Sequence, residues 1–418
     1  MTRKMKDSGI EWIGEIPEDW EVTKLKRFVK IKSGDALDKK KFIDNGDIEV
    51  YGANAKLGNY DKSNIDKESI ITGRVGTIGT LDIKVNVWIT DNVLAIDVFN
   101  ANLKFIYYFL HILNFGELSS STAQPLITAT KLLNINIAMP NSINQHKISN
   151  YLDKKTKQIE DIKNKISEEI ENLENYKKSV ITEAVTKGLD KNVEMKDSGI
   201  EWIGEIPKYW EIGKTLFYLK MPITDGPHTT PTLYDEGVPF VSAEAVASGK
   251  GKIDFNKIRG FVSEEFYLEC CKKYIPEIDD VYMIKSGATT GLTAIVDTNT
   301  KFTIWSPLAV FRADISKVNP KFLFYVLQSK YYLTQVELYW NYGTQQNIGM
   351  RTLEKLKICA PPMYEQEKIV RSLDKEIKSI DEAIESKQKQ LEILKEYKKS
   401  LIYGYVTGKK EVKDGEET

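Results

Sequence analysis

The chain has 418 residues and a formal net charge of −1, with 59 Lys and Arg against 60 Asp and Glu. Hydrophobic residues make up 41% and charged residues 28%, which is ordinary for a globular protein, and the length allows roughly two to four domains. The balanced charge excludes a uniformly basic nucleic-acid binder, so any such contact must come from a local basic face.

Two classes of protein are disfavoured by the sequence. No run of 18 apolar residues occurs, and the first residues lack the apolar core of a signal peptide, so we expect a cytoplasmic protein with no membrane partner. The three cysteines, Cys270, Cys271 and Cys359, have no metal-ligand spacing. We therefore expect no metal and no disulfide framework.

A block of 13 residues at Met5–Pro17 recurs without change at Met195–Pro207. The chain is therefore a tandem duplication, and its period of about 190 residues is too long for a solenoid, so the repeats are domains. The block contains Trp12 in its first copy and Trp202 in its second, and two roles are possible for these side chains. Each either anchors a partner protein or attaches the block to a helix end.

The segment that follows each block reads as a mixed α+β domain. Short β-rich runs, such as Ile48–Tyr51 and Val93–Ile96, are broken by Gly and Asn turns. Each segment also has one short apolar helix candidate, at Phe105–Leu110 and Phe322–Leu327. The expected divisions are 1–144 for the first block and domain, 145–190 for a helical spacer, 191–365 for the second block and domain, 366–408 for a C-terminal helix, and 409–418 for a disordered polar tail.

Each domain is followed by a helix of about 40 residues with coiled-coil spacing. Because each domain sits at the start of its own helix, the two helices can bury their apolar stripes on each other only if they run antiparallel. The halves are then related by a pseudo-twofold axis. The plainer alternative is a coiled-coil spacer without a partner. The expected helix-pair core is Ile148, Leu152, Ile159, Ile162, Ile166, Ile170, Leu173, Tyr176, Val180, Ile369, Leu373, Ile380, Leu391, Leu394, Tyr397 and Leu401.

We find no catalytic constellation. The segment Gly404–Lys409 is one residue short of a phosphate-binding loop and has no strand before it. The best acidic cluster, Glu277–Asp280 with Lys285, is explained by chance in a chain this rich in charge, and His228 has no partner nucleophile. Two alternatives stay open beside a binding subunit: a stand-alone DNA-cleaving enzyme, and a two-domain coiled-coil scaffold for a partner other than DNA.

The duplicated architecture resembles the specificity subunit of type I restriction–modification systems. The resemblance covers essentially the whole chain and is carried by the block before each domain and by the two near-copy helices. Within the domains, Tyr51–Gly58 and Asp225–Pro231 look like motifs of that family's target recognition domains. Two Gln-bearing segments, Thr122–Leu126 and Thr344–Ile348, do so as well.

The resemblance implies a non-catalytic subunit that recognises double-stranded DNA. Each recognition domain reads one half of a split asymmetric target, and the helices set the gap and dock two modification subunits. Those partners bring S-adenosylmethionine, and restriction subunits bring ATP and Mg²⁺, so we expect no cofactor on this chain. Candidate DNA-binding residues are the polar and basic loop residues Lys32, Ser33, Lys39, Lys40, Lys41, Arg74, Thr77, Gln124, His228, Thr229, Thr230, Lys285, Thr289, Thr290, Gln345, Gln346 and Asn347.

Overall fold

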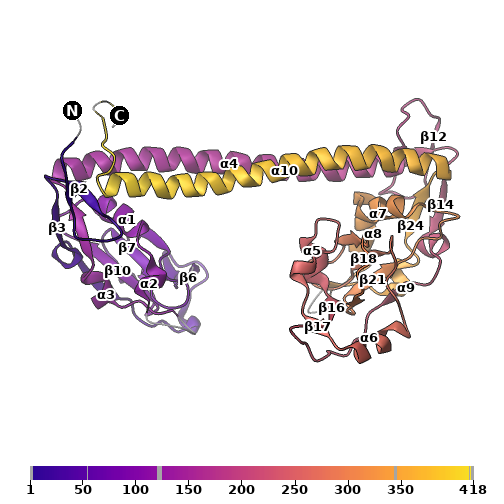
Figure 1. Cartoon of the computed structure of the whole chain (residues 1–418), viewed down its shortest axis with the longest axis horizontal. Helices are drawn as coiled ribbons and strands as arrows, with labels where there is room; N and C mark the ends of the chain where they lie inside the picture. The colour runs from indigo at the N-terminus through magenta and orange to yellow at the C-terminus, as the bar shows by residue number, and fades with distance from the viewer. Residues whose placement is uncertain (1–2, 54, 120–124, 343–345, 414, 416–418) are drawn as a thin grey trace. The chain divides into compact units, whose positions relative to one another are not determined.

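The computed structural model describes residues 3–53, 55–119, 125–342, 346–413 and 415. It divides into two compact units, Met1–Ser167 with Gln388–Thr418, and Glu168–Lys387. Each unit contains one α+β domain and about half of each long helix (Figure 1). Within the described residues, no helix combines the length and apolar character needed to cross a membrane.

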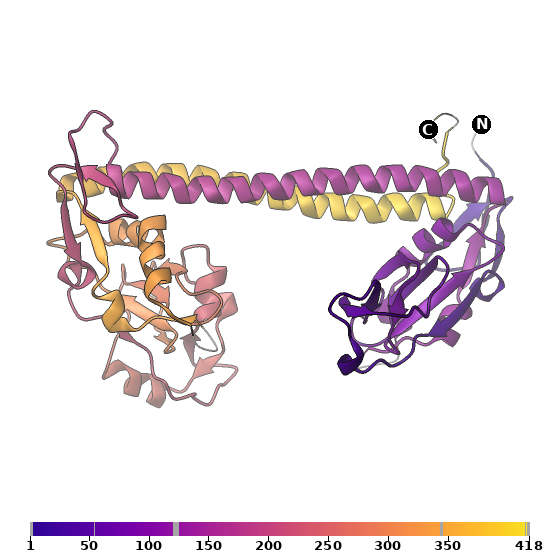
Figure 2. The ribbon, with the colours of Figure 1, turned by 180° about the vertical axis from the view of Figure 1, so that it is seen from behind.

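The long helices, α4 (Ser142–Lys187) and α10 (Met363–Val406), lie side by side in both units (Figures 1 and 2). Their contacts, taken along α4, are Tyr151 with Tyr405, Glu160 with Lys398, Glu169 with Lys387, and Lys177 with Asp381. Partner numbers fall along α10 as they rise along α4. The helix pair is therefore antiparallel, as the duplication predicted.

Most of the expected core positions are buried or half-buried, but Ile162, Tyr176 and Tyr397 are 46%, 53% and 51% exposed. Their assignment to the helix-pair core is wrong by one residue in each case. The residues that face inward at these turns are Lys163, Lys177 and Lys398, whose side chains are 31%, 20% and 36% exposed.

The heptad repeat explains this register, because Lys163 and Lys177 lie seven residues before and seven residues after Ile170 and so share its position in the repeat, whereas Ile162 and Tyr176 do not. The aliphatic stem of a lysine can cover apolar surface while its amine reaches a carboxylate. Here the Lys163 amine lies 3.0 Å from Glu160, and the Lys177 amine lies 2.7 Å from Asp381. Hydrophobicity alone therefore selected the wrong neighbour at these turns.

The first domain is built on a four-stranded antiparallel sheet in the order β4-β10-β7-β8. One face of the sheet packs against α1, and the other face carries a second cluster with Ile65, Val87 and Ile89 beside a three-stranded sheet, β6-β5-β9. The bounds are β4 Val29–Ser33, β5 Ile48–Tyr51, β6 Lys56–Tyr60, β7 Ser69–Gly73, β8 Leu81–Lys84, β9 Trp88–Ile89, β10 Val93–Val98, α1 Leu103–His111, α2 Phe115–Leu118 and α3 Ala129–Leu133.

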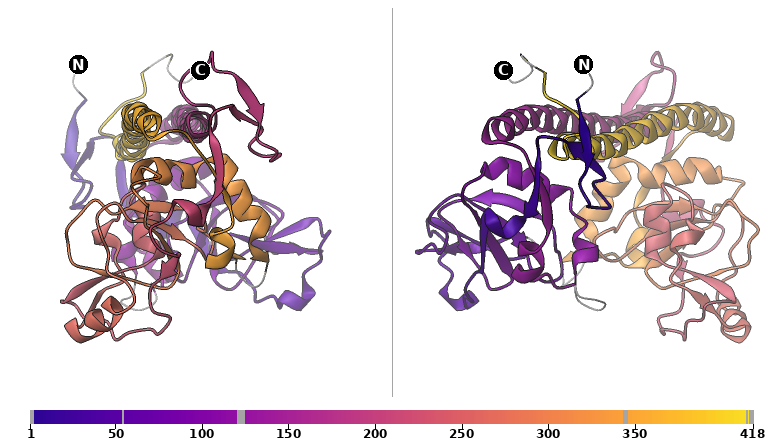
Figure 3. Two further views of the ribbon diagram at one scale, coloured as in Figure 1. Left: turned by 90° about the vertical axis from the view of Figure 1, so that its right-hand side faces the viewer. Right: turned by 60° about the vertical axis from the view of Figure 1, so that its left-hand side comes forward.

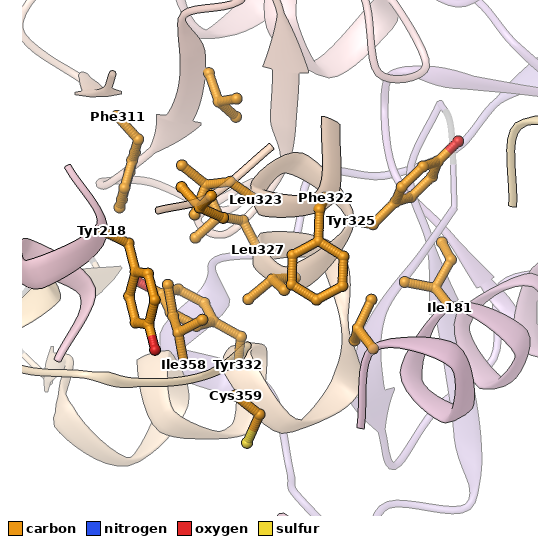
Figure 4. Close-up of a cluster of buried hydrophobic side chains, with 14 of the residues drawn as sticks. Ile181, Tyr218, Phe311, Phe322, Leu323, Tyr325, Leu327, Tyr332, Ile358 and Cys359 are labelled. Carbon is orange, nitrogen blue, oxygen red and sulfur yellow. The ribbon is translucent and has the colours of Figure 1, made fainter. Parts of the chain in front are cut away.

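The second domain repeats this sheet in the order β15-β21-β18-β19. Figure 4 shows part of its main core, to which Phe322, Leu323 and Leu327 of α7 and Phe311 of β21 all contribute. The bounds are β15 Thr224–Asp225, β16 Val238–Val241, α5 Ala243–Ser248, β17 Phe261–Val262, α6 Glu264–Cys271, β18 Val281–Ile284, β19 Thr293–Ile295, β20 Thr303–Ile304, β21 Leu308–Phe311, α7 Pro320–Gln328, α8 Lys330–Tyr339, β22 Asn341–Tyr342, β23 Gln346–Asn347 and α9 Met350–Leu353.

The strands that bring the chain into and out of each domain pair with each other. In the first domain, incoming β3 (Glu21–Lys24) is antiparallel to outgoing β11 (Asn136–Met139). In the second, β14 (Glu211–Lys214) pairs in the same way with β24 (Lys357–Ala360). In each unit, the domain therefore begins and ends at one place, beside the start of the long helix that follows it (Figure 3).

The joint between domain and helix is the same in both units. In unit 1, the Gln145 side chain accepts from the Asn102 backbone at 2.8 Å and donates to the Pro140 carbonyl at 2.9 Å. The matching residues in unit 2 are Gln366, Asn319 and Pro361, at 2.7 and 2.9 Å. Because Gln145 and Gln366 are buried, these bonds orient each domain rigidly on its own helix start.

A tyrosine and an aspartate make a second matched contact at each joint. Tyr108 donates to Asp153 at 2.7 Å in unit 1, and Tyr325 donates to Asp374 at 2.7 Å in unit 2. Burial raises the pKa of both phenols above the usual range, so each stays a protonated donor.

Each copy of the repeated block forms a small hairpin, β1–β2 (Met5–Asp7, Glu15–Pro17) and β12–β13 (Met195–Asp197, Glu205–Pro207). The first copy lies against the end of α10, where Tyr403 donates to the Trp12 carbonyl at 2.9 Å.

The tail was expected to be disordered, but its described part packs against the first unit. Lys409 donates to the Glu15 carbonyl at 3.3 Å, and Val412 is only 8% exposed. This part of the expectation is wrong, because Val412, an apolar side chain in the polar tail, packs into the hydrophobic core of the unit. Residues 414 and 416–418 lie outside the described part of the chain.

Candidate nucleic-acid interface

In the first domain, two candidate residues meet at one edge of the four-stranded sheet. Ser33 ends β4, and Arg74 follows β7; the Arg74 guanidinium donates to the Ser33 hydroxyl at 3.4 Å. The Arg74 backbone is held on both sides, because its N–H donates to Asn92 at 2.8 Å and its carbonyl accepts from Ile127 at 3.0 Å. The side chain thus projects from a fixed backbone.

The second domain has the same backbone frame at Lys285, which follows β18. Its N–H donates to Pro307 at 2.8 Å, and its carbonyl accepts from Ile348 at 2.9 Å. Lys285 lies 3.5 Å from Asp225, the last residue of β15. Arg74 therefore corresponds to Lys285, and Ser33 corresponds to Asp225, although neither pair is evident from aligned sequence.

The Gly/Thr turns meet the segments that lead out of the domains. Gly76 donates to the Pro125 carbonyl at 3.0 Å, and Gly287 donates to the Gln346 carbonyl at 3.0 Å. Both glycines have positive φ, +75° and +98°, a conformation that side chains disfavour. The turns therefore bring exposed Thr77 close to Arg74 in the first domain, and they bring three further candidates, Thr289, Thr290 and Asn347, close to Lys285 in the second.

The remaining candidate DNA-binding residues lie away from these turns or outside the described residues. Lys39–Lys41 form an exposed turn of 3-10 helix, and Phe42 after it packs over Gly58 of the β5–β6 hairpin. The Lys32 amine donates to the Asn64 carbonyl at 3.1 Å. Thr229 and Thr230 are exposed beside His228. Gln124 and Gln345 lie outside the described residues.

A buried carboxylate that the sequence reasoning did not select organises the second domain's edge. Asp225 is 1% exposed, and three basic side chains surround it: Lys273 at 2.5 Å, His228 at 3.2 Å and Lys285 at 3.5 Å. We call Asp225, His228, Lys273 and Lys285 the Asp225 cluster. Asp225 begins the Asp-Gly-Pro-His motif, and the presence of an acid in an otherwise turn-like motif could have pointed to it. No feature of the sequence around Lys273 pointed to that residue.

The acidic segment Glu277–Asp280 serves a different purpose. Asp280 is 1% exposed, and Arg312 binds both of its carboxylate oxygens at 2.7 Å. In the first domain the same two sheet positions hold Ser69 and Asp97, joined at 2.6 Å. The acidic segment thus supplies one partner of a structural ion pair, Asp280 with Arg312. Across the described residues, no group of three or more His, Cys, Asp or Glu side chains could hold a metal ion.

The two block tryptophans have different surroundings. Trp12 is 42% exposed and packs on Phe109, with ring centroids 6.0 Å apart. Trp202 is half-buried and lines a cavity of about 770 Å³ with the end of α4 and with α8. Both copies thus contact their own unit, and Trp12 in addition offers aromatic surface to solvent.

Comparison with known proteins agrees with this duplicated arrangement. The family model for the type I restriction modification DNA specificity domain matches residues 17–172 and 233–393. A putative type I restriction enzyme MjaX specificity subunit of Methanocaldococcus jannaschii is 26% identical, over 96% of this chain and 96% of that protein. The MjaVIII specificity subunit of the same organism is 24% identical, over 96% and 95%.

A solved chain from work on assembly and conformational transition of the type I restriction–modification system has the same fold, with a TM-score of 0.65. It is 16% identical, and the match covers 94% of this chain and 99% of that chain. Specificity subunits are non-catalytic components that recognise DNA within type I complexes. The chain belongs to the type I restriction modification DNA specificity family, as a specificity subunit with two recognition domains.

Proposed function

We propose that each domain reads one half of a bipartite, asymmetric DNA target through the sheet edge described above. The observation that carries this proposal is one backbone frame holding different side chains: Ser33 and Arg74 in one domain, Asp225 and Lys285 in the other. A shared frame presents both edges to DNA in the same way, and because the side chains on and around it differ between the domains, the two edges can select different bases. Arginine can pair with guanine and asparagine with adenine in the major groove.

The antiparallel helices act as the ruler for the unread gap. α4 and α10 are each a single unbroken helix, and contacts such as Tyr151 with Tyr405 in unit 1 and Lys177 with Asp381 in unit 2 pair them, which supports a helical spacer in place of a loop. In dimeric DNA-binding proteins, too, the distance between the reading elements sets the spacing of the half-sites.

Two modification subunits dock on duplicated surfaces of this frame. Tyr176 and Tyr397 occupy equivalent positions on the two helices, and each ring is about half exposed, while the Tyr176 hydroxyl donates to Glu376 of α10 at 3.1 Å. Exposed aromatic side chains are enriched at protein interfaces, and an equivalent pair offers two similar sites. In this proposal the modification subunits bring S-adenosylmethionine, restriction subunits bring ATP and Mg²⁺, this chain binds no cofactor, and the complex acts in the cytoplasm, where it meets double-stranded DNA.

Methylome sequencing of a host that expresses the complete system tests the proposal. We expect methylated adenines in one split sequence with a constant gap, and we expect them to vanish when this chain is deleted. Methylation that persists after deletion would contradict a recognition role. Cleavage of DNA by the purified chain with Mg²⁺ alone would favour a stand-alone enzyme instead.

Insertion of one heptad into α4 after Ser167, together with one into α10 before Gln388, should lengthen the gap and leave both half-sites unchanged. One heptad preserves the apolar stripes and adds about 10.5 Å of helix. At about 3.4 Å per base pair, the gap should grow by about 3 base pairs. The methylome of the variant measures it, and new half-site bases with the old gap would reject the ruler.

A further inference from the structure

The matched basic residues Arg74 and Lys285 are held by chemically different partners. In the described part of the chain, the Arg74 guanidinium has one neutral partner, the Ser33 hydroxyl at the long distance of 3.4 Å. Lys285 lies beside the buried carboxylate of Asp225, and its side chain is only 13% exposed. The first residue is weakly held, whereas the second is shielded and paired with an acid.

This contrast separates the roles of the two positions. We propose that Arg74 contacts a base of the first half-site, whereas Lys285 supports the fold beside Asp225, and that Lys273 and His228 supply DNA phosphate contacts in the second domain. The proposal rests on the proposed DNA-reading function and assigns its residues. Equivalent positions in the two domains therefore do different work.

The charge of the Asp225 cluster supports a phosphate contact. A carboxylate that is 1% exposed must be compensated by nearby cations, and Asp225 has Lys273 on one oxygen with His228 and Lys285 at the other. One negative charge faces two lysines, so the cluster keeps an excess of positive charge. Lys273 is 49% and His228 73% exposed, so this excess lies on the solvent side, where an anion can approach.

The hydrogen-bond donors of the Arg74 guanidinium support a base contact. A guanidinium has five N–H donors in a planar fork that matches the O6 and N7 acceptors of guanine. Ser33 occupies one donor weakly, so the fork remains free to turn toward DNA. The hydrogen bonds to Asn92 and Ile127 hold the Arg74 backbone in place while the side chain turns.

Two matched substitutions separate these roles: Arg74→Met and Lys285→Met, each made in the full chain co-purified with the modification subunits of its own system. The probe is random-sequence double-stranded DNA, and bound sequences are selected and counted. Arg74→Met should lose about tenfold or more of the preference at one position of the first half-site. Lys285→Met should lower the melting temperature, while the second half-site keeps its preferred bases.

A third variant tests the partner directly. Ser33→Asp gives the first domain the acid of the second, and its carboxylate should capture the Arg74 guanidinium in a bidentate pair. Preference at the same position of the first half-site should fall as in Arg74→Met, with the second half-site unaltered. A melting temperature equal to that of the unsubstituted chain would show that the loss is not caused by misfolding.

A fourth variant tests the phosphate contact. Lys273→Met should weaken binding to all sequences alike and reduce the slope of log affinity against log salt by about 1. A loss confined to one base position would overturn this assignment.

The outcomes also separate this inference from the function on which it rests. If the unsubstituted complex selects no sequence, the DNA-reading function fails. If it selects two half-sites but Lys285→Met erases one base preference, or Arg74→Met erases none, the function stands and the division of roles is wrong.

Discussion

Replacement of Arg312 by Met should lower the free energy of unfolding of the second unit by about 3–5 kcal/mol. Arg312 donates to both oxygens of Asp280, each at 2.7 Å, and Asp280 is 1% exposed. Without the guanidinium, a buried carboxylate would lose its counter-charge. A loss of this size is a large part of the stability of most domains.

The surrounding hydrogen bonds cannot replace that charge. Tyr274 and the backbone N–H of Glu277 both donate to Asp280, at 2.5 and 2.8 Å. Burial raises the pKa of the Tyr274 phenol above the usual range, so it stays a neutral donor. Neutral donors stabilise the carboxylate, but they leave its charge uncompensated in the interior.

Urea unfolding followed by near-UV circular dichroism measures the effect. Arg259→Met in the same domain is the control, because Arg259 is exposed and stacks over the Trp305 ring at 3.9 Å, a contact that contributes about 1 kcal/mol or less. Equal losses in the two variants would contradict the central role of the buried pair.

The second large effect is expected at the two tryptophans that follow the repeated block. Trp20→Ala and Trp210→Ala should each cost about 3–5 kcal/mol, since the rings are 1% and 0% exposed. Each ring packs on the glycine that follows a long helix, Gly408 for Trp20 and Gly188 for Trp210. The variants therefore destabilise different units by the same mechanism.

Trp12→Ala is the matched control for these variants, because Trp12 lies inside the block but is 42% exposed. Truncation of a partly exposed side chain creates a smaller cavity, and we expect a loss of about 1 kcal/mol. Thermal unfolding of the three variants gives the comparison. If Trp12→Ala proves as costly as Trp20→Ala, burial does not rank these positions.

The sequence predicted the architecture well because duplication makes strong demands on geometry. Strand Ile48–Tyr51 was placed with its correct bounds, and the helices at Phe105–Leu110 and Phe322–Leu327 lie within α1 and α7. The helix register was harder. At single turns, hydrophobicity favoured Tyr176 over Lys177, because burial of the Lys177 stem depends on Asp381 of the other helix, a partner that only the structure locates.

The candidate interface was predicted in part. Arg74 and Lys285 were both chosen from turns rich in Gly and Thr, and the structure gives them one backbone frame. The Asp225–Lys273 contact was missed because it joins residues 48 positions apart, and local sequence carries no signal for such pairs. The opposite roles of the two basic residues depend on their partners, which are set by tertiary packing.

The paired incoming and outgoing strands have an evolutionary consequence. Since β3 pairs with β11, and β14 with β24, everything between the members of each pair is a cassette whose two ends are adjacent. Recombination inside these strands can exchange one cassette without altering the helix pair or Gln145 and Gln366, and each glutamine can bond to a new cassette because its partner there is a backbone N–H. A lineage can thus acquire a new half-target in one genetic event and keep its old machinery.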